Sequence, residues 1–172
     1  MALTTVGHGT LPRDALRDLL LTAGVQTVVD IRIAPASRRH PHVARAALEQ
    51  WLPAAGIGYR WERRLGGFRR PARDSPDVLL RNDSFRGYAG WMRGPEFSAA
   101  VDELLASRSR VALLCSESVW WRCHRRLLAD FVHLVHGVEV CHLHHDGRRE
   151  PHRLTDGVRL RDDGLLGYHP AA

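Results

Sequence analysis

The chain has 172 residues, of which 44% are hydrophobic, and these values are typical of one globular domain that buries its own core. Its formal charge is +6 and it contains no lysine, which excludes a Schiff-base lysine and a Walker lysine. It lacks an apolar run of the roughly 18 residues that cross a bilayer, a signal-peptide pattern and an even set of cysteines, so we expect a cytoplasmic protein with reduced thiols and no membrane partner.

Apolar runs of strand length alternate with segments of helical periodicity along the chain. The runs that predict buried strands cover residues 3–6, 25–31, 57–61, 111–114 and 138–143. The segments that predict helices cover residues 12–23, 43–55 and 96–106, and a fourth begins at about Trp120. Strands that alternate with helices form a mostly parallel sheet with right-handed crossovers. We therefore predict a single α/β domain over residues 1–172, a three-layer Rossmann-like fold with helices on both faces of the sheet.

Two stretches lack this periodicity. Residues 65–84 are rich in glycine, proline and arginine, which is typical of a functional or a mobile loop. Residues 147–172 are polar, and we expect a short hairpin near residues 155–168. The turn after the first strand reads GHGTLP and lacks the third glycine of a dinucleotide-binding loop, so no dinucleotide site is expected there.

Polar side chains follow the predicted strands at the edge where open α/β sheets bind ligands. His8 follows the first strand and is a candidate general acid or base, or a turn histidine. Asp30 and Arg32 follow the second strand and share a face, because residues two apart in a strand do so. Arg32 with Arg38 could hold a carboxylate or a phosphate, or Asp30 and Arg32 could form a purely structural pair.

Cys115 ends the fourth strand, just before a predicted helix. A thiol facing a helix amino terminus, near the arginines at 122 and 125 or His124, is expected to have a lowered pKa and to act as a nucleophile. The alternative is a small buried residue that caps the strand. The spacing from Cys115 to Arg122 is one residue longer than in the loop of cysteine phosphatases, and the glycine of that loop is missing, which argues against a phosphatase.

Cys123 admits three roles, namely a resolving thiol, a metal ligand or a packing residue at the start of the helix. A metal site could combine Cys115, Cys123, His124 and His8, although the cysteine spacing is wider than in a zinc knuckle.

Four further histidines lie near the carboxyl end of the chain, and we expect them on a solvated edge rather than around a metal ion: His142, His144, His145 and His152.

The residues above resemble a family known as domain of unknown function 488. The matching segments are TVGHGT at 5–10, VVDIRIAPASRRHP at 28–41, GIGYRWERRLGGFRRP at 56–71, RNDSFRGYAGWM at 81–92, LLCSESVWWRCHRRLLAD at 113–130 and VEVCHLHHDGRREPHRLT at 138–155. The resemblance implies an α/β fold in an intracellular bacterial or archaeal protein, and supplies no reaction or cofactor. Ser116 and Trp120 stand where the family usually has alanine and often has proline, which affects the fit of a substrate but keeps the chemical groups.

Two functions from different classes fit these residues. The first is a cysteine-dependent enzyme acting on a phosphate-bearing or nucleotide-like anion, with Cys115 as nucleophile and Glu117 or His8 moving protons. The residues expected to bind its substrate, several of them family positions implied by the resemblance, are Gly7, Asp30, Arg32, Ser37, Arg38, Gly66, Gly67, Cys123, His124 and Arg125.

The second is a module that binds a nucleic-acid backbone and in which the cysteines are structural. Its contacts would come from the arginines at 63, 64, 69, 70, 73, 81 and 86. A metal-linked or redox-linked site of cysteine and histidine is a further alternative to both.

Overall fold

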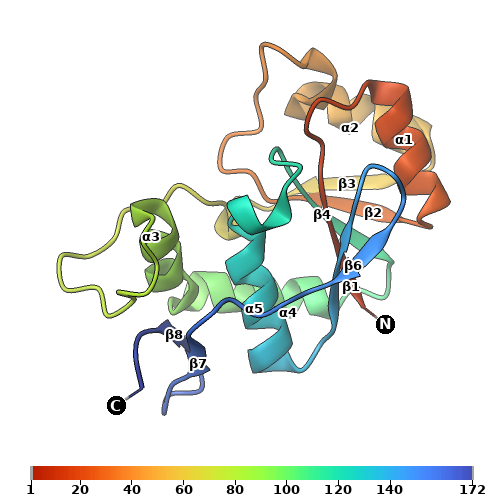
Figure 1. Ribbon diagram of the computed structural model, residues 1–172. Helices are drawn as coiled ribbons and strands as arrows, with labels where there is room; N and C mark the ends of the chain where they lie inside the picture. Colours follow the sequence, from red (N-terminus) through yellow and green to blue (C-terminus); the bar gives the residue numbers. More distant parts are fainter. Residues whose placement is uncertain (1, 172) are drawn as a thin grey trace.

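The protein contains a six-stranded sheet and a separate two-stranded hairpin (Figure 1), in a computed structural model that describes residues 2–171. The strands of the sheet are β1 (Leu3–Gly7), β2 (Thr27–Asp30), β3 (Gly58–Trp61), β4 (Val111–Cys115), β5 (Val140–Leu143) and β6 (Arg149–Pro151). Their order across the sheet is β3-β2-β4-β1-β5-β6, with the first five parallel and β6 antiparallel to β5. The hairpin pairs β7 (Val158–Leu160) with β8 (Leu166–Tyr168).

Five α-helices cover the sheet on its two faces (Figure 1). They are α1 (Arg13–Thr22), α2 (Arg45–Ala54), α3 (Asp83–Met92), α4 (Pro95–Leu105) and α5 (Arg125–His136). Short 3-10 turns occur at η1 (Pro41–Val43), η2 (Arg63–Leu65) and η3 (Trp120–Arg122). Among residues 2–171, no helix is both long and apolar enough to span a membrane.

Successive side chains of the central strands point to opposite faces and build two cores. On one face, Leu114 of β4 packs in a cluster with Leu16 of α1 and Leu48 of α2. On the other face, Leu113 lies in the cluster that contains residues of α3, α4 and α5, among them Phe131. All of these side chains are fully buried, which confirms the predicted three-layer α/β fold.

The exits of β1, β2 and β4 lie side by side at the carboxyl edge of the sheet. The backbone N–H of His8 donates to the carbonyl of Cys115 at 2.9 Å, and Ile31 N–H donates to the carbonyl of Leu114 at 3.0 Å. A Cβ on Gly7 would lie 1.9 Å from the carbonyl oxygen of Glu117, so only glycine lets the loop after β4 cross β1 this closely. The expected convergence of these three exits is thus confirmed.

One α-helix and one strand of the structure were not predicted, and one predicted helix begins later than expected. Helix α3 was missed, although the side chain of Asn82 caps it by accepting from Phe85 N–H at 3.1 Å. Strand β6 was missed because its sequence is polar and contains Pro151. The helix expected from about Trp120 begins only at Arg125, after η3.

Candidate active site

A cavity of about 370 Å³ opens at the carboxyl edge of the sheet, between the exits of β1, β2 and β4. Its wall includes six of the residues predicted from the sequence, namely His8, Arg32, Ser37, Gly67, Cys115 and His124. It also includes Ile33, Ala34, Ala36, Phe68 and Ser116, which are not among the predicted site residues. The structure therefore brings a thiol, two imidazoles and a guanidinium to one opening.

The core of the site is a cluster of Cys115, Cys123 and His124. The Nδ1 atom of His124 lies 3.9 Å from the Cys115 sulfur and 3.6 Å from the Cys123 sulfur. On the other side of the ring, Nε2–H donates to the carbonyl of Ile31 at 3.1 Å, which leaves Nδ1 to face the two sulfur atoms. Cys115 is on the cavity wall and Cys123 lies behind it, so a ligand in the cavity reaches Cys115 first.

The two thiols have opposite pKa shifts. A hydrogen bond to Cys123, together with burial, raises the pKa of Cys115 to about 12. Burial also disfavours a thiolate at Cys123, but the hydrogen bond from Cys115 and the charge of Arg125 outweigh it and lower the pKa of Cys123 to about 6. The expected lowered pKa at Cys115 is therefore wrong, because Cys115 is the donor of the pair and Cys123 holds the thiolate near neutral pH.

Arg125 is buried beneath this cluster and does not reach the cavity. It is 1% exposed, and its guanidinium donates to the hydroxyl of Thr5 at 3.4 Å and to the backbone carbonyl of Glu117. It also stabilises the Cys123 thiolate. The prediction that Arg125 binds substrate is not supported, since its charge serves a sulfur of the protein.

Arg32 lies on the cavity wall and is held from behind by Asp30. Its Nε and one Nη donate to the two carboxylate oxygens at 2.8 and 2.6 Å, and that Nη also donates to the carbonyl of Val43 at 2.7 Å. The other Nη lies 3.4 Å from Nε2 of His8. Tyr59 donates a further hydrogen bond to Asp30 at 2.8 Å, a partner that nothing in the sequence pattern indicated. Asp30 thus orients Arg32 and does not line the cavity.

His8 is a neutral histidine at neutral pH. Burial lowers its pKa to about 4, and its Nδ1–H donates to the carbonyl of Gly9 at 2.9 Å. Nε2 then carries a lone pair toward Arg32. His8 is therefore better suited to accept a hydrogen bond and position Arg32 than to deliver a proton.

The other predicted residues divide between the cavity and its surroundings. Gly67 packs against His124, where a Cβ would lie 2.9 Å from Nδ1, and the Oγ of Ser37 accepts from a backbone N–H. Arg38 is exposed and lies off the cavity wall. Glu117 is also exposed and off the wall, and its carboxylate accepts from the N–H of Val119 at 3.0 Å. Gly66 approaches the backbone of the β2 exit and has a structural role.

Cys115, Cys123 and His124 are also the group that could hold a metal ion, since their ligand atoms lie within 4.8 Å of one another. A tetrahedral zinc ion bound by sulfur and nitrogen separates these atoms by about 3.6 Å, close to the 3.6 and 3.9 Å found here. The hydrogen bond from His124 Nε2 to a backbone carbonyl is the usual outer contact of a histidine ligand.

Of the four carboxyl-terminal histidines, His145 is exposed and His144 is partly exposed as expected, whereas the side chains of His142 and His152 are buried. His142 is 1% exposed, and burial lowers its pKa to about 2. Its Nδ1 contacts Thr5 at 2.7 Å and its Nε2 contacts His152 at 3.0 Å. His152 in turn contacts the carboxylate of Asp130 at 2.9 Å, and the hydroxyl of Tyr168 donates to the same carboxylate at 2.9 Å. A buried polar chain therefore links Asp130 to Thr5 and through it to Arg125.

The other two histidines of this group also have hydrogen-bond partners. His144 contacts Glu150 at 2.8 Å, and His145 contacts the carbonyl of Gly7 at 2.7 Å.

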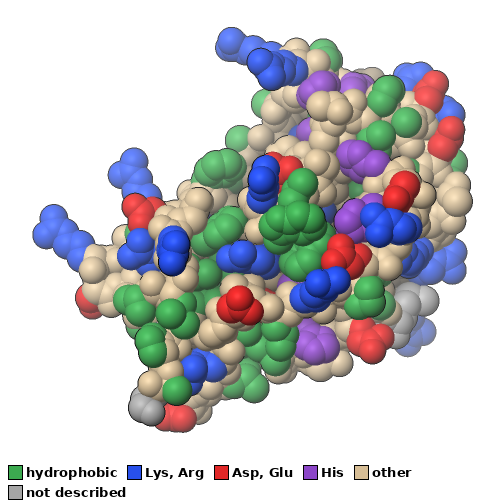
Figure 2. All heavy atoms as spheres, in the orientation of Figure 1, with side chains coloured by type: hydrophobic (Ala, Val, Ile, Leu, Met, Phe, Trp, Pro, Cys, Tyr) green, Lys and Arg blue, Asp and Glu red, His purple; other side chains and the backbone are tan. Residues whose placement is uncertain are grey.

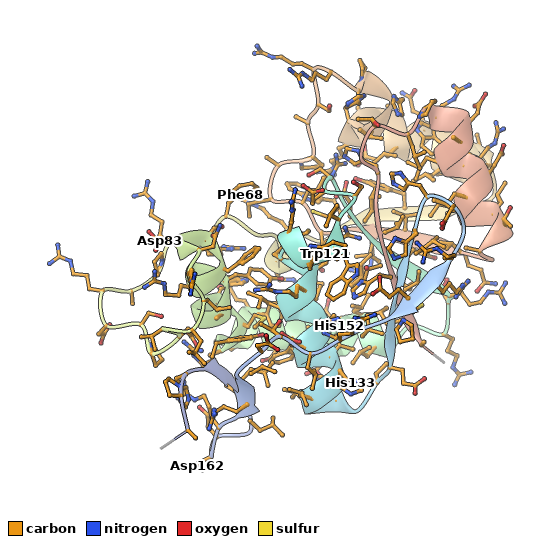
Figure 3. All side chains as sticks on the ribbon, in the orientation of Figure 1. Phe68, Asp83, Trp121, His133, His152 and Asp162 are labelled. Carbon is orange, nitrogen blue, oxygen red and sulfur yellow. The ribbon has the colours of Figure 1, made fainter. Side chains whose placement is uncertain are left out.

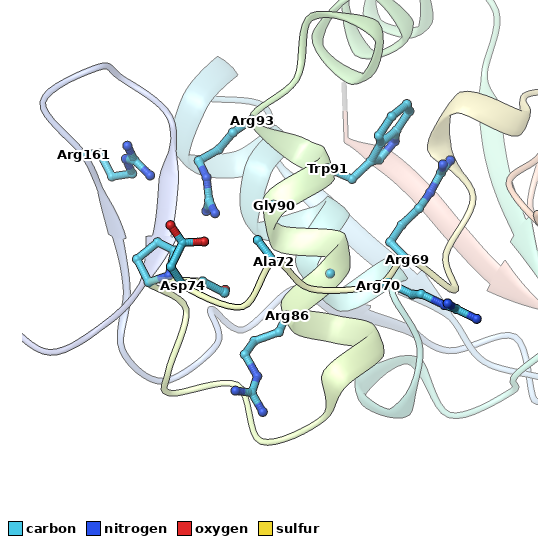
Figure 4. Close-up of a pocket in the computed structure, with 12 residues that line it drawn as sticks. Arg69, Arg70, Ala72, Asp74, Arg86, Gly90, Trp91, Arg93 and Arg161 are labelled. Atoms are coloured by element: carbon cyan, nitrogen blue, oxygen red, sulfur yellow. The ribbon is translucent and has the colours of Figure 1, made fainter.

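Three of the seven arginines predicted to contact a nucleic acid, at 64, 69 and 86, contact side chains of the protein, whereas those at 63, 70, 73 and 81 are exposed. Arg64 pairs with Glu103, and Arg69 lies over the ring of Trp91 at 3.9 Å. A second cavity, of about 580 Å³, lies between this segment and α3 (Figure 4). The arginines on its wall that form ion pairs are Arg86 with Asp83, Arg93 with Asp77 and Arg161 with Asp163. No cysteine or histidine lines it, so the smaller cavity is the better candidate for chemistry.

The fold and this cavity define an α/β protein with a thiol-containing site at the carboxyl edge of its sheet. Comparison with protein families then places it: the chain belongs to the family described as "Domain of unknown function DUF488", whose model matches residues 13–132. The match includes Arg32, both cysteines of the site and His124, and confirms the resemblance drawn from the sequence motifs. No curated protein and no solved structure matches the chain.

Proposed function

We propose that this protein is an enzyme in which the Cys115 thiol attacks a small anionic substrate bound beside Arg32. One observation carries the proposal, namely that Cys115, His124 and Arg32 line the same cavity of about 370 Å³. This volume lies in the range of small-molecule sites, and the site is at the edge where open α/β sheets bind ligands.

The cysteine pair supplies a nucleophile together with its base. Cys115 donates its proton toward the Cys123 thiolate, which Arg125 stabilises from below. When the Cys115 sulfur bonds to an electrophilic carbon or phosphorus atom and the leaving group departs with its electron pair, the thiol proton passes to Cys123. Cys115 therefore attacks as an incipient thiolate despite its raised pKa.

Arg32 supports recognition of a carboxylate or a phosphate. Asp30 fixes the fork of the guanidinium through two hydrogen bonds, which leaves the Nη near His8 without a carboxylate partner. Because Asp30 neutralises much of the charge, anion binding here depends on directed N–H groups more than on net charge. This favours a small monoanionic or dianionic group over a polyanion in the cavity.

Alkylation with matched reagents tests the proposal. Iodoacetate carries a carboxylate and iodoacetamide does not. Because Arg32 binds the carboxylate, the ratio of the iodoacetate rate to the iodoacetamide rate is expected to be higher for the native protein than for a free thiol. The adduct is expected on Cys115 and should be absent from Cys115→Ser. Inorganic phosphate should slow its formation. Arg32→Lys keeps the charge but loses the directed N–H groups of the second Nη, and should remove the preference for iodoacetate.

Cys141→Ser is the matched control, because this third cysteine is also buried but lies on β5, away from the cavity. Labelling of Cys141 alone, or an unchanged reagent preference in Arg32→Lys, would contradict the proposal.

A thiophilic metal site is the second candidate, favoured by the tetrahedral separations of Cys115, Cys123 and His124. Metal analysis of the purified protein distinguishes the two candidates. Stoichiometric zinc in the purified protein, together with alkylation of Cys115 only after a chelator has removed the zinc, would favour the metal site over the free nucleophile. Metal-free protein that is alkylated at once would support the enzyme with a free thiol.

A further inference from the structure

A third opening, a groove of about 470 Å³, lies apart from the cysteine site, between η3, the start of α3 and residues 153–156. Trp121, Phe85, Leu79 and Leu154 give it an apolar wall, and three of these are exposed hydrophobics. In Figures 2 and 3, hydrophobic side chains gather in the middle of the molecule, where Trp121 is labelled, with basic side chains around them. An exposed apolar patch with basic residues around it is typical of a binding surface.

Trp121 is held as a rigid, exposed ring. It is 49% exposed and packs edge-to-face on Trp120, with ring centroids 5.6 Å apart and planes at 89°. Trp120 is itself fixed, because it stacks on His142 at 4.1 Å and donates to Glu150 at 3.1 Å. One face of Trp121 is thus available for stacking without further ordering of the side chain.

The groove is also positively charged. Arg81, Arg126 and Arg153 line it against a single acidic residue, Asp156. The guanidinium of Arg126 lies over the ring of Phe85 at 5.2 Å, and its Nε is buried with no hydrogen-bond partner among residues 2–171. The buried hydroxyl of another wall residue, at position 155, likewise has no partner in that part of the chain. The three guanidinium groups on this wall, set against one carboxylate, favour an anionic occupant.

We propose that this groove binds a single-stranded nucleic acid, with a base stacked on Trp121 and its phosphates on Arg81 and Arg126. A flat exposed indole beside guanidinium groups is the combination that proteins use to hold unpaired bases and their backbone. An acidic peptide would satisfy the arginines but would leave the indole face unused. The proposal is independent of the cysteine chemistry, because the groove shares no residue with the cavity at Cys115.

Fluorescence anisotropy with a labelled oligothymidylate about 12 nucleotides long tests this proposal. Trp121→Ala is expected to weaken binding at least about 5-fold, and Trp121→Phe, which keeps a ring, to restore part of the loss. Arg81→Ala should weaken binding and lower the slope of log Kd against log salt by about one.

Arg108→Ala is the matched control, since it removes the same charge from an exposed position just before β4, at the opposite edge of the sheet. Cys115→Ser should bind as the native protein does, which separates this proposal from the enzyme proposed above. Equal losses in Arg108→Ala and Arg81→Ala, an unaffected Trp121→Ala, or tighter binding of a polyglutamate peptide than of the oligonucleotide would each overturn it. Circular dichroism of each variant excludes unfolding as the cause of a loss.

Discussion

Replacement of Cys123 by serine should strongly lower the reactivity of Cys115 at neutral pH, because it removes the thiolate that takes the proton. In the native protein the pKa of Cys123 is about 6, so at pH 7 about nine pairs in ten carry the thiolate, against about 3% for an ordinary thiol. The ratio of these two thiolate fractions predicts a fall of about 30-fold or more in the rate of Cys115 alkylation at pH 7. Above pH 6 the pair is active, and below it the rate falls as Cys123 takes up its proton.

The measurement is the rate of alkylation by iodoacetamide between about pH 5 and pH 9, followed by mass spectrometry of the labelled peptides. Iodoacetamide is neutral, so the pH profile reports the thiols and not anion binding at Arg32. Native protein should show a midpoint near pH 6, and Cys123→Ser a midpoint above that of a free thiol, since Cys115 remains buried. A midpoint that does not move in Cys123→Ser would refute the coupling of the two sulfurs. An adduct on Cys123 in the native protein would reverse their roles.

Three further predictions concern stability and can be measured by urea denaturation. Burial keeps His8 and His142 neutral, with pKa values of about 4 and about 2, whereas both take up protons near pH 6.5 when unfolded. The free energy of unfolding should therefore fall below pH 6.5 by up to about 1.4 kcal/mol per pH unit for each histidine, and a flat profile down to pH 4 would contradict this. Gly7→Ala should cost about 1–3 kcal/mol, because its Cβ meets the backbone carbonyl of Glu117; an unchanged midpoint would show that the loop can move away. Asp130→Asn should cost about 2–4 kcal/mol, since it removes the charge that accepts three hydrogen bonds, and a smaller loss would mean that the amide keeps them.

The parallel sheet could be predicted because its signals are local. Each buried strand is a short apolar run, and each predicted helix has a stripe of apolar residues at helical spacing. The order of the elements therefore follows from the sequence alone. Helix α3 lacked these signals, as Gly87 and Gly90 interrupt it, and Gly87 is needed because the backbone of Arg69 passes over the helix. Tertiary packing, which the sequence pattern does not encode, makes that segment helical.

The site was predicted in its residue types but not in the direction of its side chains. Arg32 and Arg125 both follow strand exits in the sequence and both are buried, yet only Arg32 lines the cavity. The difference comes from partners far away in the chain: Arg125 donates to Thr5, 120 residues earlier. The expected direction of the Cys115 pKa shift was also wrong, because it depends on which sulfur is donor and which lies nearer to Arg125, and spacing alone does not fix either.

The buried charges at this edge of the sheet support a functional origin for the cysteine cluster. Burying an arginine costs several kcal/mol unless its partners are well placed, and apolar residues of similar size usually stabilise a fold as well or better. Asp30 compensates Arg32 through two hydrogen bonds, so that pair could be purely structural. Arg125 has no carboxylate partner within residues 2–171; it donates to a hydroxyl and a carbonyl, leaves its Nε unpaired, and lowers the pKa of Cys123. That arrangement is what the proposed enzyme would need, namely a thiolate behind a reachable thiol.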